Sequence, residues 1–169
     1  MSLAVNQLIG FGARRATSSA TTYRYLQINI TAANSDASYE ITGLVFIAGG
    51  VDYPTSAMTS NTAPSPLVAS ASSDLGGSFL PFYAFNSSIA TRGWISGTAD
   101  GTDYLRIDLG AGNGIAPTSA KVAPSGVIGR SPKDFTFEGS NDATNWTVLN
   151  TQSGLTTGWT LNAYRTFTF

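Results

Sequence analysis

Short stretches of this chain carry apolar residues at every second position, and this alternation constrains the fold more than any other feature. In DYLRIDLG, Leu105, Ile107 and Leu109 share one face while Arg106 and Asp108 lie on the other. This two-residue repeat is typical of a half-buried β-strand. It recurs at four further places: Leu26, Ile28 and Ile30; Phe135 and Phe137; Trp146 and Val148; Phe167 and Phe169. No stretch has the repeat of an amphipathic helix, so the pattern predicts an all-β chain.

Turn-forming residues separate the alternating stretches, at residues 48–50, 110–114 and 140–142. Many short strands with such punctuation predict an antiparallel β-sandwich of the jelly-roll kind. At 169 residues the chain fits one domain with a sizeable core. We expect Trp94 and Trp146 to lie in that core, because large aromatic side chains dominate such interiors. Asn141 and Asp142 are expected to form the hairpin turn before Trp146.

Two segments do not alternate. Residues 1–20 precede the first strand and are interpreted as an N-terminal arm, which leaves residues 21–169 for the sandwich. Residues 52–78 are rich in Ser, Thr, Ala and Pro and predict a long loop, with one strand near Leu67 and Val68. Loops of that length in compact domains are usually functional or disordered.

Composition excludes several classes of function. The chain has no cysteine and no histidine, which removes thiol nucleophiles, Ser-His-Asp triads and thiolate or imidazole zinc sites. A net charge of −1 with 9 Lys and Arg gives no electrostatic footprint for nucleic acid. No apolar run reaches the roughly 18 residues of a membrane span, and the start lacks a signal-peptide pattern. We therefore expect a soluble, non-catalytic module with a neutral, polar surface.

Three ordered motifs, YAFNSSIATRGWISG, GTDYLRIDLG and SPKDFTFEGSNDATNWTVL, make the sequence more specific. Together they resemble the discoidin-type, galactose-binding-like jelly-roll family, over about residues 64–169. The opening TYRYLQINITAANSDASYEITGLVF resembles a strand pair that accompanies this module in phage tail and other virion proteins. That pair commonly closes the domain, so the resemblance implies a circular permutation. Residues 23–30 and 39–47 would then pair near residues 164–169.

The resemblance also implies a calcium site in the loop before Trp94. Carried over by position, its ligands would be Glu40, Asn86, Ser88 and Thr91, which offer the hard oxygen atoms that calcium prefers. Asn86 and Ser87 stand where the family has Asp-Gly, and one carboxylate in place of two weakens such a site. This departure favours the alternative, a hydrogen-bonded Asx turn with Glu40 paired to an arginine such as Arg92.

Sugar-binding members of the family use loops at one end of the sandwich, where exposed aromatic rings stack on sugars. The candidates here, with Arg130 as a polar partner, are Tyr53, Phe79, Phe82, Tyr83 and Trp159. The alternative is that these rings fill gaps under loops or face a neighbouring protein.

Two further clusters carry hypotheses. Asp100 and Asp103 could form the carboxylate pair of a glycan hydrolase, although a turn before a strand is the favoured reading. The arm is interpreted either as a floppy terminus or as a segment that orders against a neighbouring subunit through Leu8, Ile9, Phe11, Arg14 and Arg15.

The resemblance and the composition together predict a phage or phage-like virion protein, assembled in the host cytoplasm and acting outside the cell. It would attach to host-surface polysaccharide or decorate a tail or capsid, with other virion proteins as partners and a homo-oligomer left open. An accessory carbohydrate-binding module or a carboxylate-dependent glycan hydrolase is the alternative.

Overall fold

The structure is a computed structural model that describes residues 20–90, 92–97 and 103–169. Within these residues the chain forms ten strands and two short 3-10 helices. The strands are β1 (Tyr25–Ala33), β2 (Glu40–Ala48), β3 (Val51–Tyr53), β4 (Val68–Ala71), β5 (Trp94–Ile95), β6 (Asp103–Asp108), β7 (Ser119–Pro124), β8 (Pro132–Ser140), β9 (Thr147–Gln152) and β10 (Arg165–Thr168). The 3-10 helices are η1 (Pro81–Phe85) and η2 (Ile128–Arg130).

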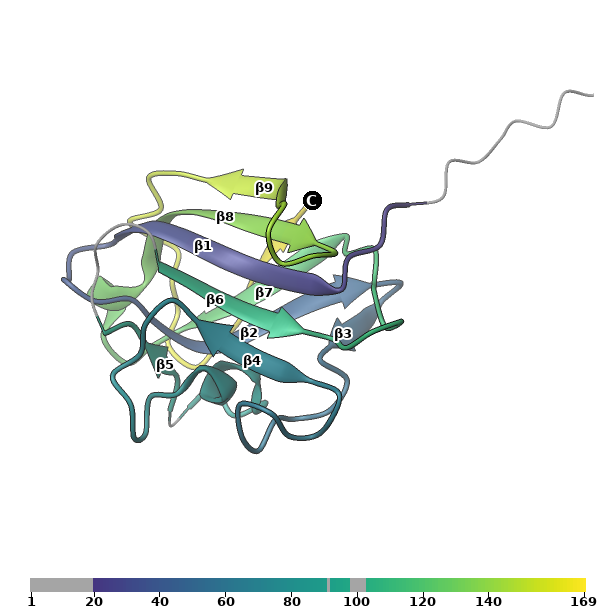
Figure 1. Ribbon diagram of the computed structural model, residues 1–169. Helices are drawn as coiled ribbons and strands as arrows, with labels where there is room; N and C mark the ends of the chain where they lie inside the picture. Colours follow the sequence, from purple (N-terminus) through teal and green to yellow (C-terminus); the bar gives the residue numbers. More distant parts are fainter. Residues whose placement is uncertain (1–19, 91, 98–102) are drawn as a thin grey trace, which may run out of the picture.

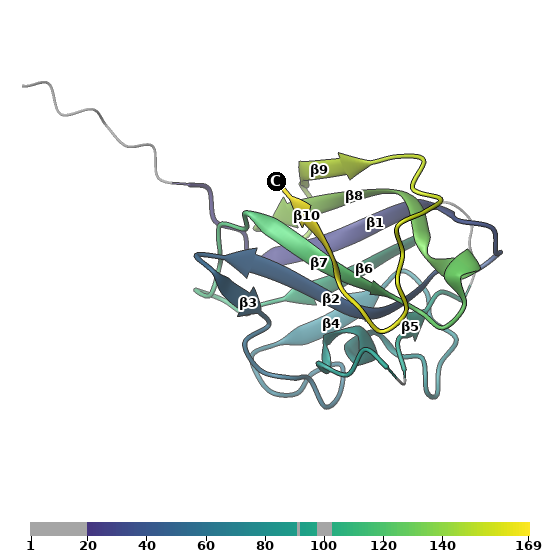
Figure 2. The ribbon, with the colours of Figure 1, turned by 180° about the vertical axis from the view of Figure 1, so that it is seen from behind.

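The strands form two antiparallel sheets packed as a sandwich (Figures 1 and 2). The first sheet has the order β4-β6-β1-β8-β9, and the second has the order β10-β7-β2-β3, with β5 also paired to β2. The predicted all-β antiparallel sandwich is therefore confirmed, and its arrangement is consistent with a jelly roll. None of the helices in the described residues is long and apolar enough to cross a membrane.

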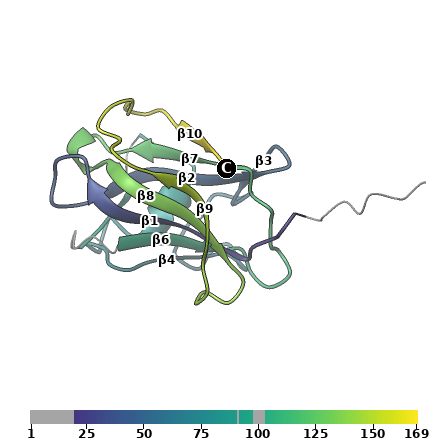
Figure 3. The same cartoon turned by 90° about the horizontal axis from the view of Figure 1, so that it is seen from above.

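The alternating apolar residues meet between the two layers, which Figure 3 shows edge-on. Leu26, Ile28 and Ile30 of β1 are fully buried, as are Leu105 and Ile107 of β6. The second sheet supplies Ile41, Leu44 and Phe46 of β2 to the same core. Phe46 meets Phe137 edge-on across the layers, with ring centroids 6.0 Å apart. The two-residue repeat thus correctly identified the inward faces of β1, β6 and β8.

The opening strands are arranged differently from the prediction. β1 lies between β6 and β8 in the first sheet, whereas β2 lies in the second, so the two do not pair with each other. The final strand, β10, pairs with β7 and with neither of them. The expected pairing of residues 23–30 with residues 39–47 beside the last strand is therefore wrong. The physical reason is that both strands have a strongly apolar face, and each sheet needs one such face to cover the other.

The two tryptophans predicted to be core residues behave differently. Trp94 is fully buried, and its indole nitrogen donates a 2.8 Å hydrogen bond to the carbonyl oxygen of Ser73. Trp146 is only half-buried and lies on the outer side of the first sheet, where its ring contacts Arg106. Val148 is 55% exposed. The core prediction is confirmed for Trp94 and wrong for Trp146 and Val148, because a bulge between β8 and β9 turns Leu149 inward instead.

The hairpin before Trp146 is held as the sequence predicts, by an acidic residue of the turn. The Asp142 carboxylate accepts hydrogen bonds from the backbone nitrogens of Thr144 and Asn145 and from the Ser140 hydroxyl. Hydrogen bonding, first of all from the Asn145 backbone, lowers the pKa of Asp142 well below its ordinary value. The long loop is also confirmed in outline, since β4 begins at Val68.

Candidate functional site

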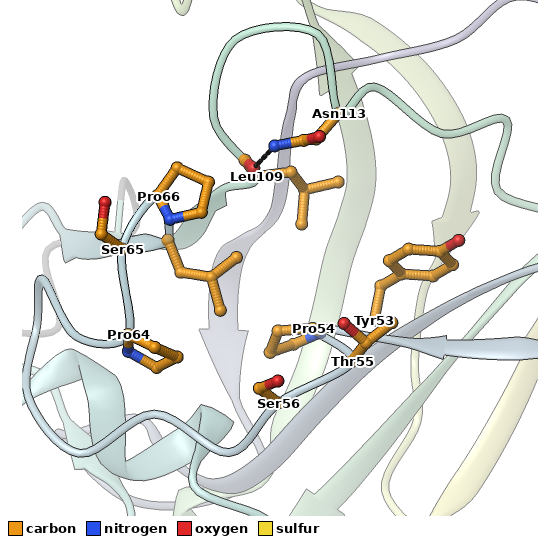
Figure 4. Close-up of a pocket in the computed structure, with 10 residues that line it drawn as sticks. Tyr53, Pro54, Thr55, Ser56, Pro64, Ser65, Pro66, Leu109 and Asn113 are labelled. Atoms are coloured by element: carbon orange, nitrogen blue, oxygen red, sulfur yellow. Dashed lines mark hydrogen bonds between the residues drawn. The ribbon is translucent and has the colours of Figure 1, made fainter.

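The long loop between β3 and β4 encloses a cleft of about 300 Å³ at one edge of the sandwich. Figure 4 shows the end of β3 and the following residues on one side of this cleft, the proline-rich part of the loop on another, and the turn after β6 above it. The lining residues are Tyr53, Pro54, Thr55, Ser56, Pro64, Ser65, Pro66, Leu67, Leu109 and Asn113. The peptide bonds before Pro54, Pro64 and Pro66 are cis.

The lining combines apolar surface with neutral polar groups. Prolines, leucines and the Tyr53 ring supply the apolar part, while serine and threonine hydroxyls and the Asn113 amide supply donors and acceptors. The Asn113 amide nitrogen donates to the carbonyl oxygen of Leu109 at 2.9 Å, which fixes the side chain at the rim. No Asp, Glu, Lys or Arg of the described residues lines the cleft. A mostly apolar cleft with a few placed polar groups is typical of a small-molecule site.

An ion pair at the end of β6 holds the start of the turn that bears Asn113. Arg24 donates two hydrogen bonds, of 2.7 and 2.8 Å, to the carboxylate of Asp108, the last residue of β6. The hydrogen bond to Asp108 is also the main cause that raises the pKa of Arg24. Asp108 in turn accepts the backbone N–H of Gly110 at 2.7 Å. These bonds place the turn on a rigid strand end.

Gly110 lies in this turn at a position where both the backbone angle and a close neighbour favour glycine. Its φ of 88° lies in the left-handed region, and a Cβ there would lie 2.5 Å from Pro66. The turn after β6 and the proline-rich loop therefore touch through a residue without a side chain. This close approach closes one wall of the cleft.

Of the aromatic residues predicted to contact a sugar, Tyr53 lines the cleft. Phe82 and Tyr83 stack on each other in η1, with ring centroids 4.1 Å apart, and they lie outside the cleft lining, as does the half-buried Phe79. Trp159 is 9% exposed and packs against Phe167 in the core, so its expected exposure is wrong. The structure thus does not gather the five rings into one site.

Most of the residues predicted to bind calcium, together with the arginine predicted to contact a sugar, form ion pairs and hydrogen bonds within the protein. Arg130 lies 3.2 Å from the Glu40 carboxylate and 3.5 Å from that of Asp36. The Asn86 side-chain oxygen accepts the backbone N–H of Ser88 at 2.9 Å, which is an Asx turn. Both parts of the alternative to calcium are present, although the partner of Glu40 is Arg130 and not Arg92.

Arg92 donates to the Tyr83 hydroxyl instead, at 3.2 Å. The described part of the chain contains no group of three or more His, Cys, Asp or Glu side chains that could hold a metal ion. Thr91, the fourth predicted ligand, lies outside the described residues.

Asp103, one of the two carboxylates proposed for hydrolysis, is 1% exposed at the start of β6. One of its oxygens accepts hydrogen bonds from the Ser72 and Ser73 hydroxyls, at 2.6 and 2.9 Å. These bonds tie the chain after β4 to β6, and the carboxylate does not line the cleft. Asp100 and the arm residues Leu8, Ile9, Phe11, Arg14 and Arg15 lie outside the described residues.

Sequence reasoning found Tyr53 but missed the other walls of the cleft. The length and proline content of residues 52–78 predict a loop that is functional or disordered. The glycine-rich run at residues 110–114 predicts only a turn. Residues 79–109 separate the two segments, and no periodic pattern links them. Comparisons with known protein families, with curated proteins and with solved structures give no match.

Proposed function

We propose that this domain is a non-catalytic binding module that holds a neutral saccharide in the cleft between the β3–β4 loop and the turn after β6. The observation that carries the proposal is the uncharged lining, in which one tyrosine ring and several prolines alternate with hydroxyl and amide groups. A sugar presents the same combination, with apolar C–H faces and neutral hydroxyls. Tyr53 would stack on a sugar face, and Asn113 would accept or donate a hydrogen bond at the rim.

The lining argues for binding without catalysis. Glycoside hydrolysis generally needs two carboxyl groups that flank the scissile bond. No acidic residue of the described chain lines the cleft, and the buried Asp103 accepts hydrogen bonds from two serine hydroxyls at one of its oxygens. The hydrolase alternative therefore gains no support from the geometry of the described residues.

We further propose that the domain is a discoidin-like module displayed on the tail or capsid surface of a phage or phage-like virion. The three ordered motifs and the opening YRYLQINI segment support this assignment by resemblance. A chain with only 11% charged residues and no cysteine suits a particle that assembles in the cytoplasm and contacts neutral polysaccharide outside. Host attachment is the role that the cleft favours, and decoration of the particle is the other.

A glycan array followed by titration calorimetry on the purified chain tests the cleft. We expect binding to neutral glycans, and Tyr53→Ala should weaken it about tenfold, because an aromatic contact contributes about 1 kcal/mol or more beyond its buried area. Tyr83→Ala is the matched control, since that ring lies outside the cleft, and it should leave the affinity unchanged. If no glycan on the array binds and the chain associates tightly with particles, the result would contradict a role in glycan recognition and support a role in decorating the particle.

A further inference from the structure

The outer face of the first sheet carries an arginine packed against two aromatic rings, away from the cleft lining. The Arg106 guanidinium carbon lies 4.3 Å from the centroid of the Tyr104 ring and 4.5 Å from that of the Trp146 ring. Tyr104 and Arg106 both point outward from β6, because Leu105 and Ile107 between and beside them point into the core. Trp146 lies in the loop between β8 and β9, and this loop covers part of the same face in Figure 1.

A polar chain beneath the rings fixes the orientation of this arginine. The Nε of Arg106 donates to the side-chain oxygen of Gln27 at 3.0 Å, and the Gln27 amide nitrogen donates to the Glu138 carboxylate at 2.6 Å. Gln27 and Glu138 are only 4% and 8% exposed, although both lie at outward-facing positions of central strands. The outer face is therefore covered and ordered here, in contrast to the open polar face that antiparallel sheets usually present.

The two terminal nitrogens of Arg106 have no partner in the described part of the chain. The Nε–Gln27 bond is the hydrogen bond that the guanidinium makes there, and neither terminal nitrogen is sealed from solvent. Arg24 and Arg130, by contrast, are paired with carboxylates. A guanidinium fixed by two rings and one hydrogen bond, with its remaining nitrogens free, is preorganised for a planar, two-oxygen anion.

We propose that Arg106, Tyr104 and Trp146 form a second binding site, which takes the carboxylate of an acidic saccharide such as a uronic acid residue. The geometry of a carboxylate matches two N–H groups of a guanidinium side by side. The half-buried Trp146 ring beside it offers an apolar surface on which the pyranose ring can lie. This site differs from the proposed cleft in position and in charge.

Glu138 makes no direct hydrogen bond with the Arg106 guanidinium in the described part of the chain. Its two carboxylate oxygens accept hydrogen bonds from Gln27 and from the Thr136 hydroxyl, at 2.6 and 2.7 Å, and the Gln27 amide lies between Glu138 and Arg106. The role of Glu138 is to hold Gln27, which in turn holds Nε. Among the described residues, Arg106 and Glu138 form no ion pair, so the guanidinium charge is not neutralised by this carboxylate.

The test titrates the full chain with an oligosaccharide that contains glucuronic acid and with its carboxyl-reduced form, in which each carboxylate is a primary alcohol. Calorimetry at low ionic strength gives the affinity, and tryptophan emission gives a local signal, because Trp94 and Trp159 are buried and Trp146 is not. We expect the acidic form to bind, the reduced form to bind at least tenfold more weakly, and added salt to weaken binding.

Arg106→Gln should reduce the affinity for the acidic form by about 10- to 100-fold, as expected for loss of a charge-assisted contact. Arg92→Gln is the matched control, since it removes the same charge from an exposed arginine elsewhere. Arg106→Lys keeps the positive charge but loses the paired N–H donors of the guanidinium, so it should recover only part of the affinity. Partial recovery would also show that the loss in Arg106→Gln is not a folding defect. Trp146→Phe should abolish the emission change and weaken binding less than Trp146→Ala does.

Three results would overturn the proposal. They are equal affinity for the two oligosaccharides, equal losses with Arg106→Gln and Arg92→Gln, and binding of short peptides with a free C-terminal carboxylate in place of the saccharide. Tyr53→Ala should leave binding of the acidic form intact. Failure of this site and failure of the cleft are therefore distinguishable.

Discussion

Replacing each of two tryptophans by phenylalanine separates a core residue from a surface one. Trp94 is fully buried and donates a hydrogen bond to the Ser73 carbonyl oxygen at 2.8 Å, whereas Trp146 is half-buried against Arg106. In Trp94→Phe the smaller ring leaves a cavity, and the partly buried Ser73 carbonyl loses its donor. The unsatisfied acceptor costs about 1–3 kcal/mol, and the cavity about 1 kcal/mol more.

We therefore expect Trp94→Phe to lower the free energy of unfolding by about 2–4 kcal/mol. Trp146→Phe keeps an aromatic ring beside Arg106 and should cost less than about 1 kcal/mol. A domain of this size is stable by roughly 5–15 kcal/mol, so both variants should fold and the difference should be measurable. Trp94→Ala, which removes the whole ring at a cost of about 3–5 kcal/mol, would be a poorer choice.

The assay is urea denaturation at 25 °C followed by far-ultraviolet circular dichroism, because tryptophan emission would report differently on the two variants. Two-state transitions with equal m-values would show that the variants differ in stability alone. Equal losses for the two variants, or a larger loss for Trp146→Phe, would refute the reasoning. Either result would mean that the second indole contributes to the interior as the sequence pattern alone predicts.

Three further tests, the first with a matched control variant, address the fold and the acidic residues. Gly93→Ala should destabilise the domain severely, because a Cβ there would lie 2.3 Å from a backbone oxygen of β2, while Gly126→Ala, with nothing within 4 Å, should be nearly neutral in the same melts. Asp142 has a lowered pKa, so its stabilising contribution is present above its unfolded pKa of about 3.9 and is lost as the pH falls through the folded pKa. The stability difference between the parent and Asp142→Asn should therefore shrink in denaturation curves recorded below about pH 4. Asp103→Ala should lower the free energy of unfolding by about 2 kcal/mol, since two hydroxyl donors lose their acceptor, and any glycan hydrolysis lost without such destabilisation would instead support a catalytic role.

The alternation of apolar residues predicted the strands well where the pairing is regular. In β6 the burial alternates at every residue from Asp103 to Asp108, as the pattern DYLRID requires. It failed at Trp146 and Val148, where one extra residue at the β8–β9 bulge reverses the faces. A bulge leaves no mark in hydrophobicity, because it depends on how two strands pair and not on either strand alone.

Contacts between distant segments could not be predicted from local pattern. The sequence predicts that Glu40 pairs with an arginine, and it does, but the partner is Arg130, which lies 90 residues further along the chain. The cleft has the same origin, since its walls come from the β3–β4 loop and from the turn after β6. Residue types indicated that a loop and a turn would form, while only the sandwich topology brings them together.

One strand, β6, links the core to both proposed sites. Its inward residues Leu105 and Ile107 are fully buried, its outward residue Arg106 carries the guanidinium of the second proposed site, and Leu109 just beyond its end lines the cleft. Because a strand alternates its faces, substitutions on the outer face leave the packed face intact. A site built on such a strand is held rigidly, so little conformational entropy is lost on binding. Loss of binding without loss of stability is therefore the outcome that this architecture allows at Arg106, whereas Leu105→Ala, which truncates a fully buried side chain, should lower the free energy of unfolding by about 2–5 kcal/mol.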